Sequence, residues 1–391
     1  MSRLFVGNFD FEHELAVPSG WQPSAAVRRM SAERAVSWIS IAEDGDLIWT
    51  PEPIPDDFWE SIAQHDLPRV RGVADGKIVR TTDCEIIPWG WSASTRAIGR
   101  STLSPSDSAV RQGNSREWSF ALEQKLGVAL PGAVRLEQIE ELTEAVRHSA
   151  SEFGEPLTEH AWVIKANFGM AARERLLGRG PTLTAAHQRW LSRRLAADGV
   201  VFFEPWLRRR AEVGIQWTLS NHDAPKLEGI TSLLCDSQGG YRGSEFSLDT
   251  IIPREWQDTV DHCEQAAKQL QAAGYFGPLG IDAAIYEDSA GTTHVRPLQD
   301  INARFTMGRL ALGFRRLLRA GERGVWQHGR IEELGPNTNS EQMREIDLTP
   351  LFVGDKPPTH GSRLRIQQPT GINARIASEA DLLVHRDSWE D

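Results

Sequence analysis

The chain has 391 residues, of which 40% are hydrophobic and 25% charged, an ordinary globular composition with room for two or three domains. Its formal charge of −11 at pH 7 argues against a nucleic-acid-binding protein, because phosphate contacts need a basic surface. A local basic pocket for a small phosphate-bearing ligand is still compatible with this charge.

Cysteine and histidine usage argues against metal centres built on sulfur or imidazole. Cys84, Cys235 and Cys263 are far apart and form no metal-type spacing, so we expect reduced thiols in a cytoplasmic protein. The histidines form no HxxH or HExxH pair. The N-terminal segment carries acids within its apolar part, unlike a signal peptide. No run reaches the roughly 18–20 apolar residues that span a bilayer, so no membrane partner is expected.

Residues 1–105 alternate strand-like and helix-like segments. β-Branched and aromatic residues predict strands over 4–9, 36–42, 46–50 and 84–92, and residues 56–65 have the acidic start and apolar spacing of a helix. This alternation indicates a small α/β domain with a mostly parallel sheet, in which ligands bind beyond the carboxyl ends of the strands. The polar loop residues there are pocket candidates, although plain loop polarity explains them equally well: Asn8, Asp10, Glu12 and residues 89–92.

The next segment predicts a linker and two helices. Residues 101–114 are polar and rich in Ser, Pro and Gly, which is typical of a linker or loop. Asn114 or Ser115 then caps a helix that ends at Gly127. Residues 135–153 have apolar positions at helical spacing and predict a second, amphipathic helix.

A lysine and a basic loop follow. Residues 161–169 predict a strand that carries Lys165 inside an apolar run, where a cation is costly unless it has a partner. Residues 169–180 contain three glycines together with Arg173, Arg175 and Arg179, and match neither GxxxxGK[ST] nor GxGxxG. Because glycine lets backbone N–H groups approach an anion and arginine adds donors, this loop indicates polyphosphate binding. A solvated basic loop is the alternative.

The strands that follow carry acids. After a helix over 181–198, residues 200–207 and 211–219 predict strands with Glu204 and Glu212, and residues 227–246 predict a hairpin. A helix over 254–276 leads to residues 274–308, where we expect two strands and a helix start. Residues 306–321 predict a basic amphipathic helix, and residues 331–391 a tail with a strand-like segment at 363–368.

Oxygen-bearing side chains gather in residues 274–308. Asp300 and Asn302 are two apart and therefore share one face of a strand, and Arg304 continues that parity. Asp282 lies in the preceding strand. Carboxylate and amide oxygens suit Mg²⁺, which usually shares its ligand sphere with substrate phosphates. Taken alone, however, the same stretch is more typical of a solvated acidic hairpin.

The order of these signals resembles the ATP-grasp superfamily of carboxylate–amine ligases. The resemblance covers about residues 1–320 and implies an α/β and α+β fold class, namely an ATP-grasp fold preceded by a Rossmann-like preATP-grasp domain. The division that it implies is residues 1–105 for the preATP-grasp-like domain, 106–203 for the lid-containing part, 204–330 for the part with the metal site, and 331–391 for a C-terminal tail.

The resemblance also implies roles for single residues. Lys165 and the loop residues Arg173 and Arg175 would hold ATP phosphates, while Glu204, Trp206 and Glu212 would lie on the adenine and ribose side. Asp282, Asp300 and Asn302 would be the Mg²⁺ ligands. Arg304 and Lys165 would be catalytic, with Arg304 holding the acyl phosphate or substrate carboxylate. Asp300 departs from the glutamate that is common there, and for a second family lysine the nearest cation is Arg116.

The implied function is an ADP-forming ligase that uses ATP and Mg²⁺ to join a small-molecule carboxylate to an amine through an acyl phosphate. A homodimer is compatible with this expectation. Two alternatives stay open, a catalytically silent ATP- or metabolite-binding protein and an ATP-grasp phosphotransferase. A substrate-facing group could come from Arg242, from Arg304 or from the first domain's Asn8, Asp10 and Glu12.

Overall fold

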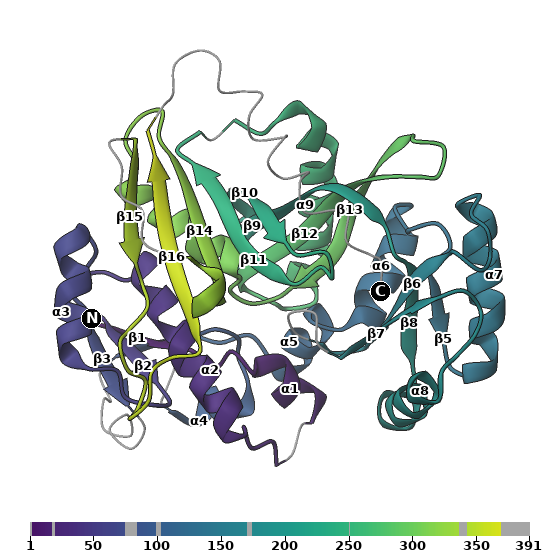
Figure 1. Cartoon of the computed structure of the whole chain (residues 1–391). Coiled ribbons are helices and arrows are strands. Elements are labelled where there is room, and N and C mark those ends of the chain that lie inside the picture. Colours follow the sequence, from purple (N-terminus) through teal and green to yellow (C-terminus); the bar gives the residue numbers. More distant parts are fainter. Residues whose placement is uncertain are drawn as a thin grey trace.

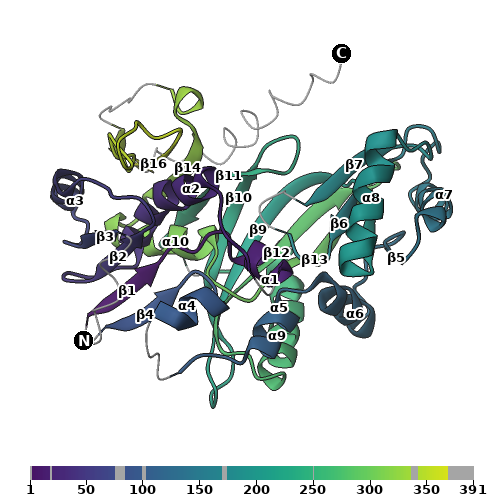
Figure 2. The ribbon, with the colours of Figure 1, turned by 90° about the horizontal axis from the view of Figure 1, so that it is seen from below.

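The computed structural model describes residues 2–17, 20–74, 84–98, 103–169, 174–249, 251–335 and 342–368. Three β-sheets organise the chain, and we call them sheets A, B and C in chain order of their first strands. Sheet C lies between sheet A and sheet B (Figures 1 and 2). Within the described residues, no helix has both the length and the apolar character needed to cross a membrane.

Sheet A is the parallel sheet that the alternating N-terminal pattern predicts. Its strand order is β3–β2–β1–β4, and all three pairings are parallel. The strands are β1 (Arg3–Val6), β2 (Leu47–Thr50), β3 (Arg71–Ala74) and β4 (Glu85–Pro88). The helices of this region are α1 (Phe11–Ala16), α2 (Ala25–Ala35), α3 (Asp56–Ile62) and α4 (Ala93–Ile98).

Two predictions in the N-terminal third are wrong. Residues 36–42 were expected as a strand, but Val36–Ser40 form the 3₁₀ helix η1 directly after α2. All five residues are buried, and a run buried on every side has no periodicity that distinguishes helix from strand. The linker expected over 101–114 contains helix α5 (Asp107–Gly113), whose first turn is capped by the Ser106 side chain accepting from the Ala109 amide at 3.2 Å.

Sheet B is a separate antiparallel unit at one end of the molecule (Figure 1). Its order is β5 (Val134–Leu136), β8 (Val201–Pro205), β6 (Ala161–Ala166) and β7 (Arg175–Arg179). Helices α6 (Arg116–Leu126), α7 (Leu142–Glu152) and α8 (Ala185–Asp198) complete this part of the chain. The helix predicted over 135–153 therefore begins only at Leu142, after the short strand β5. The loop predicted over 169–180 contains strand β7.

Sheet C has eight antiparallel strands in the order β13–β12–β9–β10–β11–β14–β16–β15. The strands are β9 (Arg208–Leu219), β10 (Lys226–Cys235), β11 (Tyr241–Ser247), β12 (Gly277–Glu287), β13 (Thr293–Asn302), β14 (Arg323–Arg330), β15 (Met343–Asp347) and β16 (His360–Gln367). The two strands and the helix start expected over 274–308 are confirmed as β12, β13 and α10 (Met307–Gly313). The helix predicted over 306–321 is shorter, because it turns into the 3₁₀ helix Phe314–Leu317. Helix α9 (Gln257–Ala272) precedes β12.

The C-terminal segment is part of sheet C. Strands β15 and β16 pair with each other, and β16 pairs with β14 along its whole length. Glu33 of α2 accepts hydrogen bonds from the Thr359 amide at 2.7 Å and from its hydroxyl, so β16 is also tied to the sheet A region. Residues 342–368 therefore belong to the sheet of residues 208–330, although the sequence predicted a tail.

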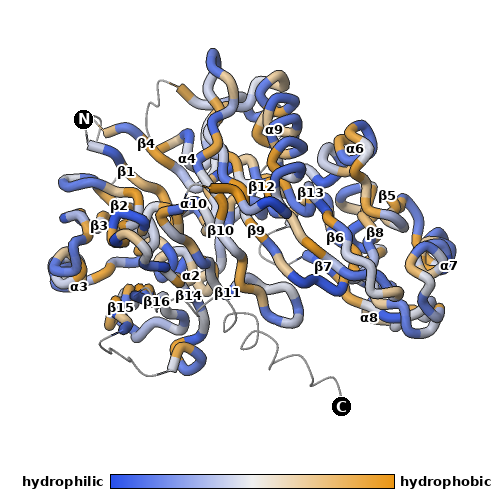
Figure 3. The backbone as a smooth tube through the Cα atoms, turned by 90° about the horizontal axis from the view of Figure 1, so that it is seen from above, coloured by the Kyte–Doolittle hydropathy of each residue, from blue (hydrophilic) through white to orange (hydrophobic). Residues whose placement is uncertain are grey.

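Among the four buried hydrophobic clusters of the described residues, the two largest follow from this arrangement. The larger core joins sheets A and C, since Phe5 and Ile48 of sheet A belong to the same buried cluster as Ile215 and Leu364 of sheet C. Sheet B has its own core, formed under α7 and α8. Both helices alternate hydrophobic and hydrophilic residues along their length (Figure 3), as expected for helices that pack one face on a sheet.

Candidate functional site

A cavity of about 380 Å³ opens where the three sheets meet, and we call it the main cavity. Its volume lies within the roughly 300–1,000 Å³ that is usual for small-molecule sites. Eight basic and six acidic side chains line it, in a chain whose net charge is −11. The positive balance of the cavity against the negative balance of the chain favours an anionic ligand.

All the predicted site residues that the structure describes line the main cavity: Lys165, Arg175, Glu204, Trp206, Glu212, Asp282, Asp300, Asn302 and Arg304. Arg173 lies outside the described residues. Of the N-terminal candidates, Trp89 lines the cavity, but Asn8 donates to the Gly90 carbonyl at 2.8 Å and Asp10 accepts from Trp21 Nε1 at 2.7 Å. Asn8 and Asp10 therefore hold local structure together.

Strand β6 explains how a lysine sits in an apolar run. Trp162 and Ile164 point into the core under α7 and α8, so Lys165, the next residue along the strand, faces the opposite side. There Lys165 Nζ donates to Glu204 Oε2 of the neighbouring strand β8 at 2.7 Å. Burial lowers the lysine pKa, while the Glu204 charge opposes this shift. The lysine thus has the partner that its position required.

Glu204 belongs to a larger buried charge network. Arg296 of β13 donates to both Glu204 oxygens, at 2.7 and 3.1 Å, and its Nη2 lies 3.5 Å from Glu123 Oε2 of α6. Burial opposes ionisation of Glu204, but the charges of Arg296 and Lys165 outweigh it and hold the Glu204 pKa below its usual range. Burial raises the pKa of Glu123 to about 7, against the opposing charge of Arg296.

An aromatic side chain flanked by cations forms the wall near the end of β8. The guanidinium groups of Arg209 and Arg175 lie 4.7 and 5.5 Å from the Trp206 ring centre. Arg175 also donates to the Gln238 carbonyl in the β10–β11 turn. Glu212 accepts from Arg209 at 2.9 Å and from Gln299 at 2.8 Å. This wall offers a ring face and several donors to a flat, polar ligand.

The predicted metal ligands meet across two strands. Asp282 of β12 and Asp300 of β13 are directly opposite in the strand register, and Asn302 Nδ2 lies 3.5 Å from Asp282 Oδ2. Burial, together with the charge of Asp300, raises the pKa of Asp282 to about 8. Asp300 accepts from Arg116 at 3.1 and 3.5 Å. Two facing carboxylates whose mutual repulsion raises a pKa form a place where a cation is favoured.

This set is small for a metal site built by protein alone. Among the described residues, no three His, Cys, Asp or Glu side chains converge as metal ligands. Two carboxylates and one amide oxygen suit a cation that completes its coordination sphere with water or phosphate oxygens, as Mg²⁺ does. The donor set is therefore compatible with Mg²⁺ held jointly with a ligand.

Arg304 closes the site on the side of sheet A. Its Nε donates to Glu12 of α1, and its Nη2 donates to Asn302 Oδ1 at 2.9 Å. Its guanidinium lies 5.3 Å from the Trp89 ring centre. The Arg304 guanidinium thus connects Asn302 to α1 and Trp89 of the sheet A region. Arg304 itself lies outside β13, which ends at Asn302.

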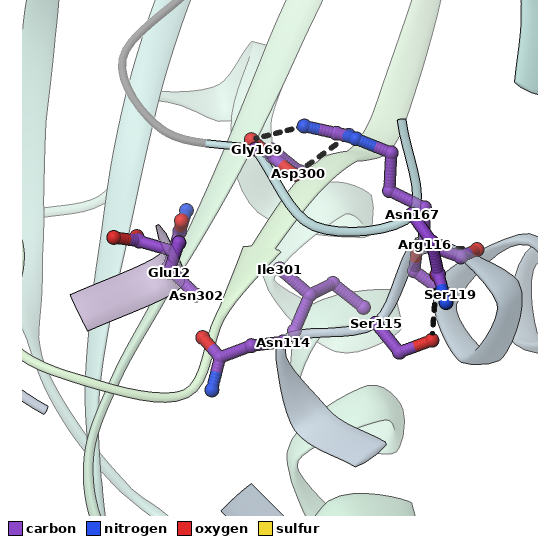
Figure 4. Close-up of a pocket in the computed structure, with 10 residues that line it drawn as sticks. All are labelled: Glu12, Asn114, Ser115, Arg116, Ser119, Asn167, Gly169, Asp300, Ile301 and Asn302. Atoms are coloured by element: carbon purple, nitrogen blue, oxygen red, sulfur yellow. Dashed lines mark hydrogen bonds and ion pairs between the residues drawn. The ribbon is translucent and has the colours of Figure 1, made fainter. Parts of the chain in front are cut away.

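Glu12, Asp300, Asn302 and Arg116 line a small recess of about 10 Å³ beside the main cavity, with α6 supplying Arg116 (Figure 4). The recess and the main cavity share Arg116, Gly169, Asp300 and Asn302. Its volume is enough for roughly one water-sized group. Such a group would lie near the carboxylates of Glu12, in the sheet A region, and of Asp300, in sheet C.

Sequence reasoning missed Arg296, Gln299 and Glu123. Alternation along β13 predicts one cavity face through Asp300 and Asn302, but the register between β12 and β13 shifts between Asp282 and Ala284. The extra residues of this bulge turn Gln299 toward the cavity as well, whereas Arg296 shares the parity of Asp300 and Asn302, so alternation alone could have found it. Pro297, inside an otherwise strand-like run, was a usable signal for the bulge.

No protein-family model matches the sequence, and no curated protein matches it significantly. Solved structures do match the fold. N5-carboxyaminoimidazole synthetase from Staphylococcus aureus, complexed with ADP, has 10% sequence identity and a TM-score of 0.50, with 97% of this chain and 95% of that chain covered. The biotin carboxylase domain of Hydrogenobacter thermophilus 2-oxoglutarate carboxylase, in complex with MgADP, ADP and bicarbonate, has 10% identity and a TM-score of 0.52, covering 94% and 86%. Biotin carboxylase from Campylobacter jejuni has 12% identity and a TM-score of 0.50, covering 94% and 88%.

Proposed function

We propose that this chain, which has the ATP-grasp fold of these structures, is an ATP-dependent ligase that joins a carboxylate to an amine and releases ADP and phosphate. The observation that carries the proposal is the meeting in one cavity of Lys165 from sheet B with Asp282 and Asp300 from sheet C and with Arg304, which follows β13. A cation beside facing carboxylates is the arrangement that a polyphosphate shared with a metal ion requires.

The nucleotide would lie along sheet B. Lys165 and Arg175 supply positive charge for its phosphates, and Trp206 offers an aromatic face for its base. Glu212 is the proposed ligand of the ribose hydroxyls, and Glu204 supports this side through Lys165. The ADP complexes of two of the neighbouring structures support a nucleotide as the ligand of this fold.

Asp282, Asp300 and Asn302 would hold Mg²⁺, for the reasons of donor chemistry given above. When bound, the ion offsets the negative charge that develops on the transferred phosphoryl group. Asp300 would first exchange its contact with Arg116 for the ion, and Asp282 would bind in its ionised form.

The proposed reaction has two displacements. An oxygen of the substrate carboxylate attacks the γ-phosphorus of ATP, the bond to the β-phosphate oxygen breaks, and ADP leaves. The amine nitrogen then attacks the acyl carbon, the carbon–oxygen bond to the phosphate breaks, phosphate leaves, and the nitrogen loses a proton. Lys165 stabilises charge in the first step and Arg304 orients the carboxylate, while the cavity walls exclude water from the acyl phosphate.

We also propose that the chain divides into residues 1–105, 106–203, 204–330 and 331–391. Residues 342–368 share the sheet of the third part. The unpaired thiols Cys84, Cys235 and Cys263 support a cytoplasmic location. The partners would be a small carboxylate and a small amine, with a homodimer as the candidate assembly.

ADP release, measured over a panel of carboxylates combined with a panel of amines that includes ammonium chloride, tests the proposal. The ligase requires release that depends on both components. Asp300→Ala should abolish detectable Mg·ATP binding in calorimetry, because it removes half of the facing carboxylate pair. Binding equal to that of the parent would show that the metal assignment is wrong.

A second candidate, a nucleotide-binding protein without catalysis, is favoured by the contact that Arg116 makes with Asp300. Nucleotide binding without turnover anywhere in the panel would support this candidate. ADP release that needs the acid alone and leaves a stable phosphorylated product would instead indicate a phosphotransferase.

A further inference from the structure

Glu12 is a buried carboxylate that the nucleotide and metal roles leave unused. It lies on α1 in the sheet A region and is only 4% exposed. Its Oε1 accepts a hydrogen bond from Arg304 Nε, so that its other oxygen, Oε2, remains available to a ligand. Glu12 Oε2 is fully buried and has no hydrogen-bond partner among the described residues. A buried carboxylate oxygen without a donor is costly, so a ligand that supplies one is expected.

The recess that Glu12 lines has the size and the position for one small donor group. It has room for about one water-sized group and adjoins the main cavity through Asp300 and Asn302. Figure 4 shows Glu12 beside Asn302. A substrate held in the main cavity near Arg304 can therefore extend a single terminal group into the recess.

We propose that Glu12 Oε2 binds the amino group of the amine substrate, an inference that rests on the ligase function proposed above. A primary amine supplies the missing N–H donor and fits a recess of this size. A second metal ion fits less well, because Arg116 lines the recess and Arg304 contacts Glu12, so that two guanidinium groups repel a dication there.

This placement defines the substrate class and the fate of a proton. The nitrogen must carry a hydrogen for Glu12 and a lone pair for the acyl carbon, which excludes a tertiary amine. The recess of about 10 Å³ favours a primary amine or ammonia over the bulkier secondary amine. As the nitrogen–carbon bond forms, the carbon–oxygen bond to phosphate breaks and phosphate leaves with that electron pair. The proton lost by the nitrogen passes to Glu12 Oε2 and from there to solvent.

Glu12→Gln tests the inference, with Glu14→Gln as the matched control. Glu14 lies on the same helix, but its carboxylate accepts from Ser94, away from the cavity. With the acid and the amine that the parent uses, Glu12→Gln should lower amide formation by about 100-fold or more. Hydroxamate formation with hydroxylamine, which is uncharged at neutral pH, should fall less than about tenfold. Glu14→Gln should match the parent in both assays.

The results of these assays separate the outcomes. If Glu12→Gln forms amide at the parent rate, the inference is overturned. Equal losses with the amine and with hydroxylamine, together with weaker Mg²⁺ binding, would overturn it in favour of a metal ligand. If Glu12→Gln does not fold, the amide and hydroxamate assays are compared in Glu12→Asp instead, because its carboxylate keeps the charge but lies on a shorter side chain. A parent that gives neither amide nor hydroxamate contradicts the proposed function itself, whereas a normal hydroxamate assay in all variants leaves that function standing.

Discussion

Lys165 owes its position in the cavity wall to a buried network of charges. Glu204 bonds both Lys165 and Arg296, and the Arg296 side chain is only 4% exposed. In such a network each charge is tolerated because its partners are present, so removing one member leaves the others uncompensated. The nucleotide site is therefore expected to depend on residues that do not touch the nucleotide.

Glu204→Gln should be strongly destabilising, because it leaves the Lys165 and Arg296 cations buried beside a neutral amide. We expect a loss of about 3–5 kcal/mol in the free energy of unfolding, measured by urea denaturation. Glu144→Gln, which breaks the exposed pair with Arg147, should cost less than about 1 kcal/mol. Similar losses in the two variants would contradict the role of the network.

Glu123 makes the stability of the same network depend on pH. Its folded pKa of about 7 lies above its ordinary value of 4.5, so the folded state holds this proton more tightly. The stability that this provides is complete below about pH 4.5 and is lost as the pH rises through about 7. Glu123→Gln cannot ionise. As the pH rises from 5 to 8, the free energy of unfolding of Glu123→Gln should therefore increase by up to about 3 kcal/mol relative to that of the parent.

Thermal and urea unfolding of both proteins across this pH range measures the difference. Glu117→Gln, on the same helix but half-exposed, is the control and should follow the pH dependence of the parent. A constant difference between Glu123→Gln and the parent at every pH would be inconsistent with the raised pKa.

Among the elements, the β10–β11 turn closes the cavity over Trp206. Gly239 has a φ of +74° in this turn, and a Cβ there would lie 3.0 Å from Arg209 Nη2 and 3.3 Å from the Trp206 ring. Gly199 has nearly the same φ, +72°, at the end of α8, and a Cβ there would meet nothing within 4 Å. The two glycines thus share a backbone conformation that would strain any residue with a Cβ, but they differ in their surroundings.

Gly239→Ala and Gly199→Ala should each lose about 1 kcal/mol of stability, because alanine is strained at positive φ. Only Gly239→Ala should also weaken ATP binding, by roughly tenfold, since it displaces the side chains that flank the proposed base position. Calorimetric titration with ATP, beside thermal unfolding, measures the two effects. An equal affinity loss in Gly199→Ala would show that strain alone is responsible.

Elements with a clear period or a clear cap were predictable from the sequence, and buried or irregular ones were not. The cost of a cation in an apolar run predicted that Lys165 has a partner, and the pair Asp300 and Asn302 predicted the cavity face of β13. The sequence could not predict that residues 36–40 are helical, since burial on all sides removes the period. The sequence offered Glu12 as a pocket candidate but did not reveal its contact with Arg304, which joins distant parts of the chain, and it did not reveal Gln299, which a register shift turns toward the cavity.

On the scale of the whole molecule, the position of the cavity follows from how the cores are divided. Sheets A and C share one hydrophobic core, while sheet B has another. Polar contacts join sheet B to the rest at the site, such as Arg296 with Glu204 and Arg175 with Gln238, and a small apolar cluster with Phe153 and Tyr286 joins them as well. A ligand in the main cavity therefore lies at the boundary between the two larger cores.

This division predicts two cooperative units in amide hydrogen exchange. Phe203→Ala, in the core of sheet B, should cost about 3–5 kcal/mol and speed exchange in β5, β6, β8, α7 and α8, while β1 and β9 keep the parent rates. Ile48→Ala, in the shared core, should speed exchange in sheets A and C together. ATP should reduce the effect of Phe203→Ala, because binding across the boundary stabilises both units. Faster exchange throughout the chain in both variants would mean that the three sheets unfold as one unit.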